Sequence, residues 1–230
     1  MFPVYNEAPR IRRLVGKLRE GLADRFLAIN DGSTDDGPEI LRSHGIEVLD
    51  QPRQGIGACI KRTVAYAREN GFDILVLMAG NDKDDPREIP KLVAPITEDG
   101  AVYVQGSRFL PGGSSPNLPR FRRQSIRLLS LLFSIYTRRR CTDLTNGFRA
   151  YRLSLLDDPR IDIWQSWLDT YEYEYYVHFK AYTLGYEVRE IPVTKAYPTD
   201  PNESYSKIQP VKGWWLMLRP LLFLALRIKK

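Results

Sequence analysis

The hydrophobic and polar positions in the first half of the chain switch repeatedly between two periods. Apolar residues recur at helical spacing in the first such stretch, at Ile11, Leu14, Val15, Leu18 and Leu22. A short apolar run over 26–29 then has the length of a strand. The same alternation predicts further helices over 38–43 and 56–70, and further strands over 46–49, 74–78 and 102–105. Alternating strands and helices favour an α/β fold with a mostly parallel, Rossmann-like sheet flanked by helices.

The second half predicts fewer strands and a change of composition near the end. After a Gly, Ser and Pro loop at 112–116, we expect helices over 120–136 and 164–184 and a strand over 188–193. From residue 206 onward, the composition is unlike the rest of the chain and is rich in Trp, Leu, Lys and Arg. We therefore expect a main domain over 1–200 and an amphipathic tail over 201–230. The loop-like segment 3–7 has almost nothing before it, so the first strand is expected to be truncated or missing.

Composition narrows the functional class. The net charge of +6 favours phosphate-rich partners, namely an anionic membrane, phosphorylated substrates or nucleic acid. No nucleic-acid recognition motif is present, so nucleic acid is not an expected partner. Cys59 and Cys141 lack the spacing of a zinc or disulfide framework, which favours a reducing cytosolic compartment. No signal-peptide pattern is visible, and the longest apolar stretch, 214–226, is too broken by Arg219 and Pro220 to span a bilayer.

The ends of the predicted strands carry the candidate chemistry. The segment 30–35 (Asn-Asp-Gly-Ser-Thr-Asp) follows a strand and precedes a helix. An Asp in that place can bind nucleotide hydroxyls, and the glycine lets a ligand approach the backbone. The alternative is an ordinary strand-to-helix turn with a capping side chain.

Six motifs in order resemble the family 2 glycosyltransferases, which have a GT-A nucleotide-binding fold. They are Pro3-x-Tyr5-Asn6-Glu7 and the segments 30–35, 54–58, 84–90, 106–109 and 143–152. Within that family the chain is most similar to the dolichyl-phosphate mannose synthase-like branch. That branch transfers a sugar from a nucleotide to a polyprenyl phosphate.

The resemblance implies a donor site and an acceptor site. Donor-binding residues would be Pro3, Tyr5, Glu7, Asn30, Asp31, Gly80 and Asn81. Acceptor-binding residues would be Arg108, one of Arg122 or Arg123, and Asp143 and Arg149 of the acceptor-side loop. Asn30 stands where the family usually has Asp, which implies an altered base preference. The alternative for the arginines is a solvated surface charge, and for the loop a capped turn.

The metal-binding motif of the family is altered. Asp-x-Asp normally holds Mg²⁺ or Mn²⁺ against the donor diphosphate, but Ala79 and Asn81 occupy those positions here. Three hypotheses follow. Lys83 replaces the metal charge in a metal-independent reaction; or Asp82 with Asp84 or Asp85 forms a shifted metal site; or the site is inert and only binds. The acidic run 82–85 is otherwise a solvated loop.

Glu172 and Glu174 are the candidate catalytic bases, although a phosphate acceptor is already ionised and needs none. Residues two apart do not share a helix face, so only one of the two is expected to point into the site. The alternative is a surface glutamate among core aromatics. The lone histidines, His44 and His178, are expected to have core or surface roles.

The tail predicts contact with a membrane surface. Its apolar residues are Trp214, Trp215, Leu216, Leu218, Leu221, Leu222, Leu224 and Leu226, and its basic residues are Lys212, Arg219, Arg227, Lys229 and Lys230. Such a helix can lie in the headgroup region, or it can simply close the core. Arg138, Arg139 and Arg140, after the apolar stretch 128–135, form a second candidate contact. We expect a peripheral protein on the cytosolic face of the membrane.

These inferences together predict an inverting, hexosyltransferase-type enzyme of cell-envelope glycan biosynthesis. It would move a sugar from a nucleotide-diphosphate donor to a polyprenyl phosphate. One alternative is transfer to a sugar hydroxyl of a glycolipid or surface polysaccharide. Another is a catalytically inert, membrane-associated module that binds a nucleotide sugar.

Overall fold

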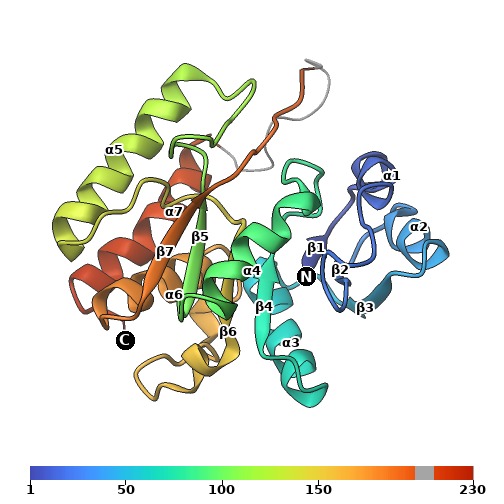
Figure 1. Ribbon diagram of the computed structural model, residues 1–230, viewed down its shortest axis with the longest axis horizontal. Helices are drawn as coiled ribbons and strands as arrows, with labels where there is room; N and C mark the ends of the chain where they lie inside the picture. Colours follow the sequence, from blue (N-terminus) through green and yellow to red (C-terminus); the bar gives the residue numbers. More distant parts are fainter. Residues whose placement is uncertain (200–209, 230) are drawn as a thin grey trace.

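The computed structural model describes residues 1–199 and 210–229 (Figure 1). Its strands are β1 (Phe2–Val4), β2 (Leu27–Asp31), β3 (Glu47–Gln51), β4 (Ile74–Leu77), β5 (Tyr103–Ser107), β6 (Arg149–Arg152) and β7 (Val188–Pro192). Its helices are α1 (Ala8–Val15), α2 (Gly37–Ser43), α3 (Ile56–Glu69), α4 (Ile89–Thr97), α5 (Arg120–Thr137), α6 (Glu172–Thr183) and α7 (Pro210–Ala225), with 3-10 turns η1 (Pro86–Glu88), η2 (Leu153–Asp157) and η3 (Ser166–Leu168).

The strands form a mostly parallel sheet, as predicted. In one part, β1, β2 and β3 run parallel, and in the other the order is β4-β6-β5-β7. Met1 links the two parts: its nitrogen donates to Val76 O at 2.7 Å, and its carbonyl accepts from Met78 N at 3.0 Å. That pattern is the one a parallel pair makes. The first strand is therefore present, although it spans only three residues.

One strand runs against the others. β6 is antiparallel to both β4 and β5, whereas β5 and β7 are parallel. The sequence placed Arg149 in an acceptor-side loop, whereas the structure places it at the start of strand β6. Ala150 and Tyr151 are both fully buried, so the segment lacks the alternation of apolar and polar positions that identifies a half-buried strand.

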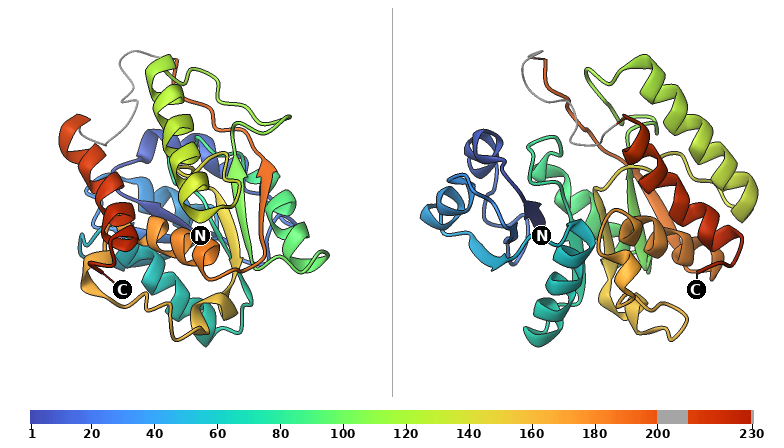
Figure 2. Two further views of the ribbon diagram at one scale, coloured as in Figure 1. Left: turned by 90° about the vertical axis from the view of Figure 1, so that its left-hand side faces the viewer. Right: turned by 180° about the vertical axis from the view of Figure 1, so that it is seen from behind.

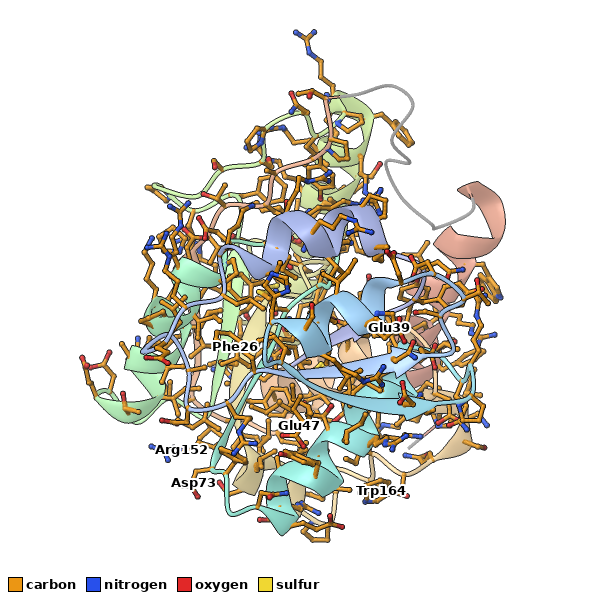
Figure 3. The ribbon with its side chains drawn as sticks, turned by 90° about the vertical axis from the view of Figure 1, so that its right-hand side faces the viewer. Phe26, Glu39, Glu47, Asp73, Arg152 and Trp164 are labelled. Carbon is orange, nitrogen blue, oxygen red and sulfur yellow. The ribbon has the colours of Figure 1, made fainter. Side chains whose placement is uncertain are left out.

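Helices cover both faces of the sheet. Leu75, Leu77 and Tyr103 point into a core shared with α3 and α6, while Ile74, Val76 and Val104 point into a core shared with α1, α2 and α4. This division follows from the two-residue period of a strand. Figure 3 shows β3, which carries Glu47, passing between α2 and α3. The result is three layers, with helix, sheet and helix stacked in that order.

Two expected element boundaries change, and a third is not tested. α1 ends at Val15, where Gly16 follows and weakens helix continuation. The helix expected over 164–184 begins only at Glu172. Trp164 lies in a turn before it, where the backbone N–H of Trp164 donates to Asp162 Oδ1 at 2.9 Å (Figure 3). The expected boundary between domain and tail near residue 200 falls outside the described residues.

The last helix packs on the domain. Leu224 of α7 is buried in the same core as α6, and α5 and α7 lie side by side (Figure 2). Tyr136 of α5 donates to Ala225 O of α7 at 3.4 Å. Within the described residues, none of the helices has both the length and the apolar character needed to cross a bilayer.

Candidate active site

A cavity of about 740 Å³ opens where several strands end. Its lining comes from the end of β2, from the segments after β1, β3, β4, β5 and β7, and from residues of α3, α5, β6 and the start of α6. Carboxyl ends of parallel strands are where open α/β sheets bind ligands, because the loops there diverge to the two faces. Most of the residues that the sequence singled out lie at this cavity, and the exceptions are informative.

The segment after β1 contributes one wall. Pro3, Tyr5 and Glu7 all line the cavity, as the resemblance implied. The guanidinium of Arg53 lies 3.7 Å from the centre of the Tyr5 ring, and Glu7 bonds to Arg10 Nη1 at 2.6 Å. This wall therefore combines an aromatic face with cationic groups, a surface that suits a nucleotide.

The turn after β4 passes so close to β1 that position 80 must be a glycine. A Cβ on Gly80 would lie 2.5 Å from the backbone oxygen of Pro3. The glycine therefore allows the turn after β4 to approach β1 closely, and it lines the cavity itself.

Asp31 and Asn30 have separate roles. Asp31 lines the cavity, and its carboxylate accepts from Gln51 Nε2 at 2.9 Å, Gln54 N at 2.8 Å and Gly55 N at 3.0 Å. It thereby holds the loop that opens α3. Asn30 does not line the cavity, because its amide donates to Asp50 at 2.8 Å and accepts from Ser33 N. The structure thus places Asn30 outside the cavity lining, so its donor-binding role stays a prediction.

In the described structure, the carboxylates of the acidic run after β4 do not converge on one point. Asp82 accepts from Lys17 at 2.6 Å and Arg13 at 3.2 Å, and Asp85 caps η1 and pairs with Arg87. Asp84 accepts from Lys195 and from Ala79 N. The three carboxylates point to different partners, and none of them lines the cavity. Among the described residues, no three His, Cys, Asp or Glu side chains converge on one point. These residues do not fit a divalent cation.

Lysines stand at the cavity in place of those carboxylates. Lys83 and Lys195 both line it, with Ala79, Gly80 and Asn81. Burial, reinforced by Lys195 and Arg10, lowers the pKa of Lys83 to about 8. The Oδ1 atom of Asn81 is buried without a hydrogen-bond partner in the protein. This part of the cavity therefore offers positive charge to an anionic ligand. The Asn81 oxygen can accept a hydrogen bond from a donor group of the same ligand.

The arginines separate into cavity-lining and structural groups. Arg108 lines the cavity and pairs with buried Asp143 through bonds of 2.6 and 2.7 Å, while its Nη1 bonds to Tyr197 Oη at 2.5 Å. Asp143 itself does not line the cavity. Of the two alternatives, Arg122 lines it, whereas Arg123 lies outside the lining near Ser115 O.

Arg149 also lines the cavity, although its sequence position had been assigned to a loop. It extends from β6 and donates to Tyr103 Oη at 2.8 Å and to Glu174 O at 3.0 Å. Its Nε is buried without a hydrogen-bond partner in the protein.

His178 and Cys141 lie behind Tyr103, and burial lowers the pKa of His178 well below its usual range. The prediction of a core role for His178 is confirmed, and exposed His44 has the alternative surface role.

The two candidate bases also separate. Glu172 is fully buried and accepts from Arg219 Nε of α7 at 2.8 Å, outside the cavity lining. Glu174 lines the cavity, with its Oε1 3.7 Å from Arg149 Nη2. Only Glu174 remains in reach of a ligand.

Sequence reasoning missed several lining residues, among them Arg10, Arg53, Lys195, Thr145, Tyr175 and Tyr197. Arg53 and Lys195 follow the carboxyl ends of β3 and β7, so the strand-end rule that identified Asp31 could have found them. The others come together only through the tertiary fold.

Comparisons with known proteins agree with this geometry. The family model described as "Glycosyl transferase family 2" matches residues 1–158. An undecaprenyl-phosphate mannosyltransferase of Micrococcus luteus is 27% identical over 84% of this chain and 81% of its own. A dolichyl-phosphate hexose transferase of Haloferax volcanii is 27% identical over 91% of this chain and 85% of its own.

A solved structure shares the fold. The glucosyl-3-phosphoglycerate synthase of Mycobacterium tuberculosis, crystallised with Mg²⁺ and uridine diphosphate, superposes with a TM-score of 0.69. The match covers 100% of this chain and 79% of that one at 19% identity, which supports the fold alone. The α/β fold, the cavity at its strand ends and the match of the family model over most of the chain lead to one conclusion: the chain belongs to glycosyl transferase family 2.

Proposed function

We propose that this protein transfers a sugar from a nucleoside-diphosphate donor to a polyprenyl phosphate at a membrane surface, with inversion at the anomeric carbon. One observation carries the proposal: a single cavity is lined both by cations suited to a diphosphate and by a second cationic group, Arg108 and Arg122, suited to another phosphate. Relatives named for transfer to undecaprenyl and dolichyl phosphates support the lipid acceptor.

The proposed reaction is a single displacement. An ionised oxygen of the acceptor phosphate attacks the anomeric carbon, and a new carbon–oxygen bond forms. The bond from that carbon to the donor diphosphate breaks, and its electron pair stays on the diphosphate. No proton has to be removed, so no base is required. The protein's contribution is to align the two phosphates and to stabilise charge on the leaving group.

Arg108 is well suited to hold the acceptor phosphate in one orientation. Its side chain is almost fully buried, and Asp143 and Thr145 fix its guanidinium by hydrogen bonds of 2.6 to 2.8 Å. A group held in this way does not need to be ordered when the acceptor binds, which reduces the entropic cost of binding.

The outer face of α5 supports a membrane location. α5 buries Ile126, Ser130 and Phe133 and exposes large apolar side chains, from 52% for Tyr136 to 73% for Phe121. The exposed set is Phe121, Leu128, Leu131, Leu132, Ile135 and Tyr136. Arginines stand at both ends of the helix, at 120, 122, 123 and 127 and at 138 to 140. An apolar face bordered by cations suits an anionic bilayer surface.

Some residues of the tail add exposed apolar side chains to those of α5. Trp215, Leu222, Leu226 and Ile228 are exposed, whereas Leu224 packs in the core. The side chains of Lys212, Trp214 and Leu216 and residue Lys230 lie outside the described part of the structure, so their membrane role stays a prediction. Because Arg122 lies in the first turn of α5, one helix would carry both a phosphate ligand and a lipid-facing surface.

The proposal is tested by transfer of radiolabelled sugar from a panel of nucleotide sugars into organic-extractable polyprenyl phosphate. We expect one donor to give a labelled lipid. No transfer from any donor would contradict the proposal, and donor binding would then distinguish an inert binding module from an enzyme with another acceptor.

Neighbouring arginines provide a matched comparison for the acceptor site. Arg122→Ala removes a cavity-lining cation, whereas Arg123→Ala removes one outside the cavity. We expect the first to lower kcat/KM for the lipid acceptor about tenfold or more, the loss of roughly one charge-assisted contact of 1.5–3 kcal/mol. The second should change it little. Equal losses would contradict the assignment of Arg122.

Transfer to a sugar hydroxyl is the second candidate, because Glu174 lines the cavity and offers a carboxylate base. Under this alternative, Glu174→Gln abolishes turnover while donor binding is retained. Under the main proposal, the same variant keeps its phosphate-directed activity.

A further inference from the structure

We propose that Lys83 and Lys195 together bind the donor diphosphate without a metal ion, with Asp84 as the positioning residue of Lys195. This inference rests on the proposed function for the identity of the donor. It differs from that function because it assigns the charge at the leaving group to two side chains of this chain.

The backbone places the two lysines together. Lys83 follows β4 and Lys195 follows β7, more than a hundred residues later. An antiparallel bridge pairs Asp84 with Lys195, and Ala196 N donates to Lys83 O at 2.8 Å. Both lysines therefore extend from one pair of hydrogen-bonded segments, and both line the cavity.

Both carboxylate oxygens of Asp84 accept hydrogen bonds within this arrangement. Its Oδ1 accepts from Lys195 Nζ at 2.6 Å, and its Oδ2 accepts from Ala79 N at 3.0 Å. The side chain is fully buried, so neither oxygen faces solvent. Asp84 therefore ties the ammonium of Lys195 to the end of β4, beside Ala79 and Asn81, rather than offering a ligand to a cation.

The charges around this point favour a polyanion. Among the residues that the structure describes, the cations there include Lys83, Lys195, Arg10 and Arg122, and the carboxylates that face them include Glu7 and Asp84. Within this described set the cations outnumber the carboxylates, and Lys83 is only 8% exposed. A bound diphosphate would add negative charge beside these cations, where the shortage of water strengthens the attraction.

This charge would act in the transfer step. When the bond between the anomeric carbon and the diphosphate breaks, negative charge accumulates on the departing phosphate oxygen. Two ammonium groups fixed beside that oxygen can stabilise it without reorganisation, which is the task that a divalent cation performs in other enzymes. The step forms one carbon–oxygen bond and breaks another, and it needs no further reactant.

The test measures binding rather than turnover. Uridine and guanosine diphosphates are titrated calorimetrically into the full chain in EDTA, beside the corresponding monophosphates. We expect one diphosphate to bind in EDTA, and added Mg²⁺ or Mn²⁺ to change its Kd less than about threefold. Lys83→Met and Lys195→Met should each weaken diphosphate binding about tenfold or more, the effect of losing one charge-assisted contact. Monophosphate binding should change less.

Three further variants separate positioning from folding. Asp84→Asn should weaken diphosphate binding, since it frees Lys195, whereas Lys195→Arg should retain binding because its charge remains. Lys91→Met removes an exposed lysine of α4 outside the cavity and should have no effect. Thermal unfolding of each variant identifies any that fail to fold, and Lys83→Met and Lys195→Arg then still decide the outcome.

Diphosphate binding that requires Mg²⁺ or Mn²⁺, or that survives both Met substitutions, would overturn the inference. Lipid transfer that is lost in EDTA would contradict metal-free binding of the diphosphate and leave the proposed function intact. Diphosphate binding in EDTA without any lipid transfer would support this inference and contradict the proposed function.

Discussion

At the scale of single residues, the carboxylates near the cavity act mainly as anchors for other groups. Asp31 holds the loop before α3, Asp84 holds Lys195, and Asp143 holds Arg108. Each carboxylate is buried and accepts two or more hydrogen bonds. It therefore fixes the position of its partner and is less available to bind a ligand. The residues left to meet substrate at this end of the cavity are therefore largely basic.

The pKa of Lys83 makes donor binding pH-dependent. Its pKa lies near 8 because of burial and the nearby charges of Lys195, Arg10 and Arg122, with Glu7 acting in the opposite direction. Below that value Lys83 is charged and attracts the diphosphate, and above it the charge is lost. Nucleotide phosphates are already ionised above a pKa of about 6, so they do not contribute to the change. We expect the Kd for diphosphate to rise between pH 7.5 and 9.5, by at most about tenfold per pH unit.

Lys83→Arg provides the control, because an arginine stays charged across this range. Its diphosphate affinity should be nearly independent of pH. The same decline in Lys83→Arg as in the parent would show that another group titrates.

The Arg108–Asp143 pair should be important for stability as well as for binding. Asp143→Ala leaves a buried guanidinium without its counter-charge, and we expect the free energy of unfolding to fall by about 3–5 kcal/mol. Asp157→Ala breaks the exposed pair with Arg68 and should cost less than about 1 kcal/mol. Denaturant titration of both variants measures the difference, and equal losses would contradict this account.

At the scale of elements, α5 differs from an ordinary surface helix in the apolar side chains that it exposes. Its solvent side carries several large apolar side chains in addition to polar ones. The sequence predicted the helix almost to the residue, since 120–136 became Arg120–Thr137. It did not reveal which apolar residues face outward, because both faces of the helix are rich in Leu, Ile and Phe and only packing separates them.

Membrane binding should depend on this outward face. Replacing Leu131 and Ile135 by Glu places two charges on it, and we expect vesicles of anionic phospholipid to retain far less protein on sedimentation. Trp164→Glu is the matched control, since Trp164 is 54% exposed but lies in the turn before α6 (Figure 3). Diphosphate binding should be unchanged in both proteins. Equal retention of the α5 variant and the parent would argue against this surface.

At the scale of the whole molecule, the order of motifs predicted the fold class and the family, whereas the site was predicted only in part. Pro3, Tyr5, Glu7, Asp31 and Arg108 line the cavity because each lies at or just after the end of a strand. That position can be read from local pattern. Asn30, Asp82, Asp84 and Arg123 lie near strand ends or helix starts as well, yet their partners turn them away from the cavity.

Long-range pairing decides which of the strand-end and helix-start residues meet at the cavity. Lys195 reaches the end of β4 through a bridge to a segment more than a hundred residues earlier, and Glu172 is withdrawn by Arg219 of the last helix. Such contacts depend on the sheet order and on how α7 packs against α6. The position of Lys195 after β7 is a local signal, but its partner at the end of β4 is not.

The measurement that tests the central claim most directly compares two acceptors that differ by one phosphate group. Radiolabelled sugar from the accepted donor is offered to a polyprenyl phosphate and to the corresponding polyprenol. The account predicts a labelled lipid from the polyprenyl phosphate and none from the alcohol, because Arg108 and Arg122 select the phosphate and the ionised oxygen needs no base. Equal transfer to both lipids, or transfer only to a sugar hydroxyl, would contradict it.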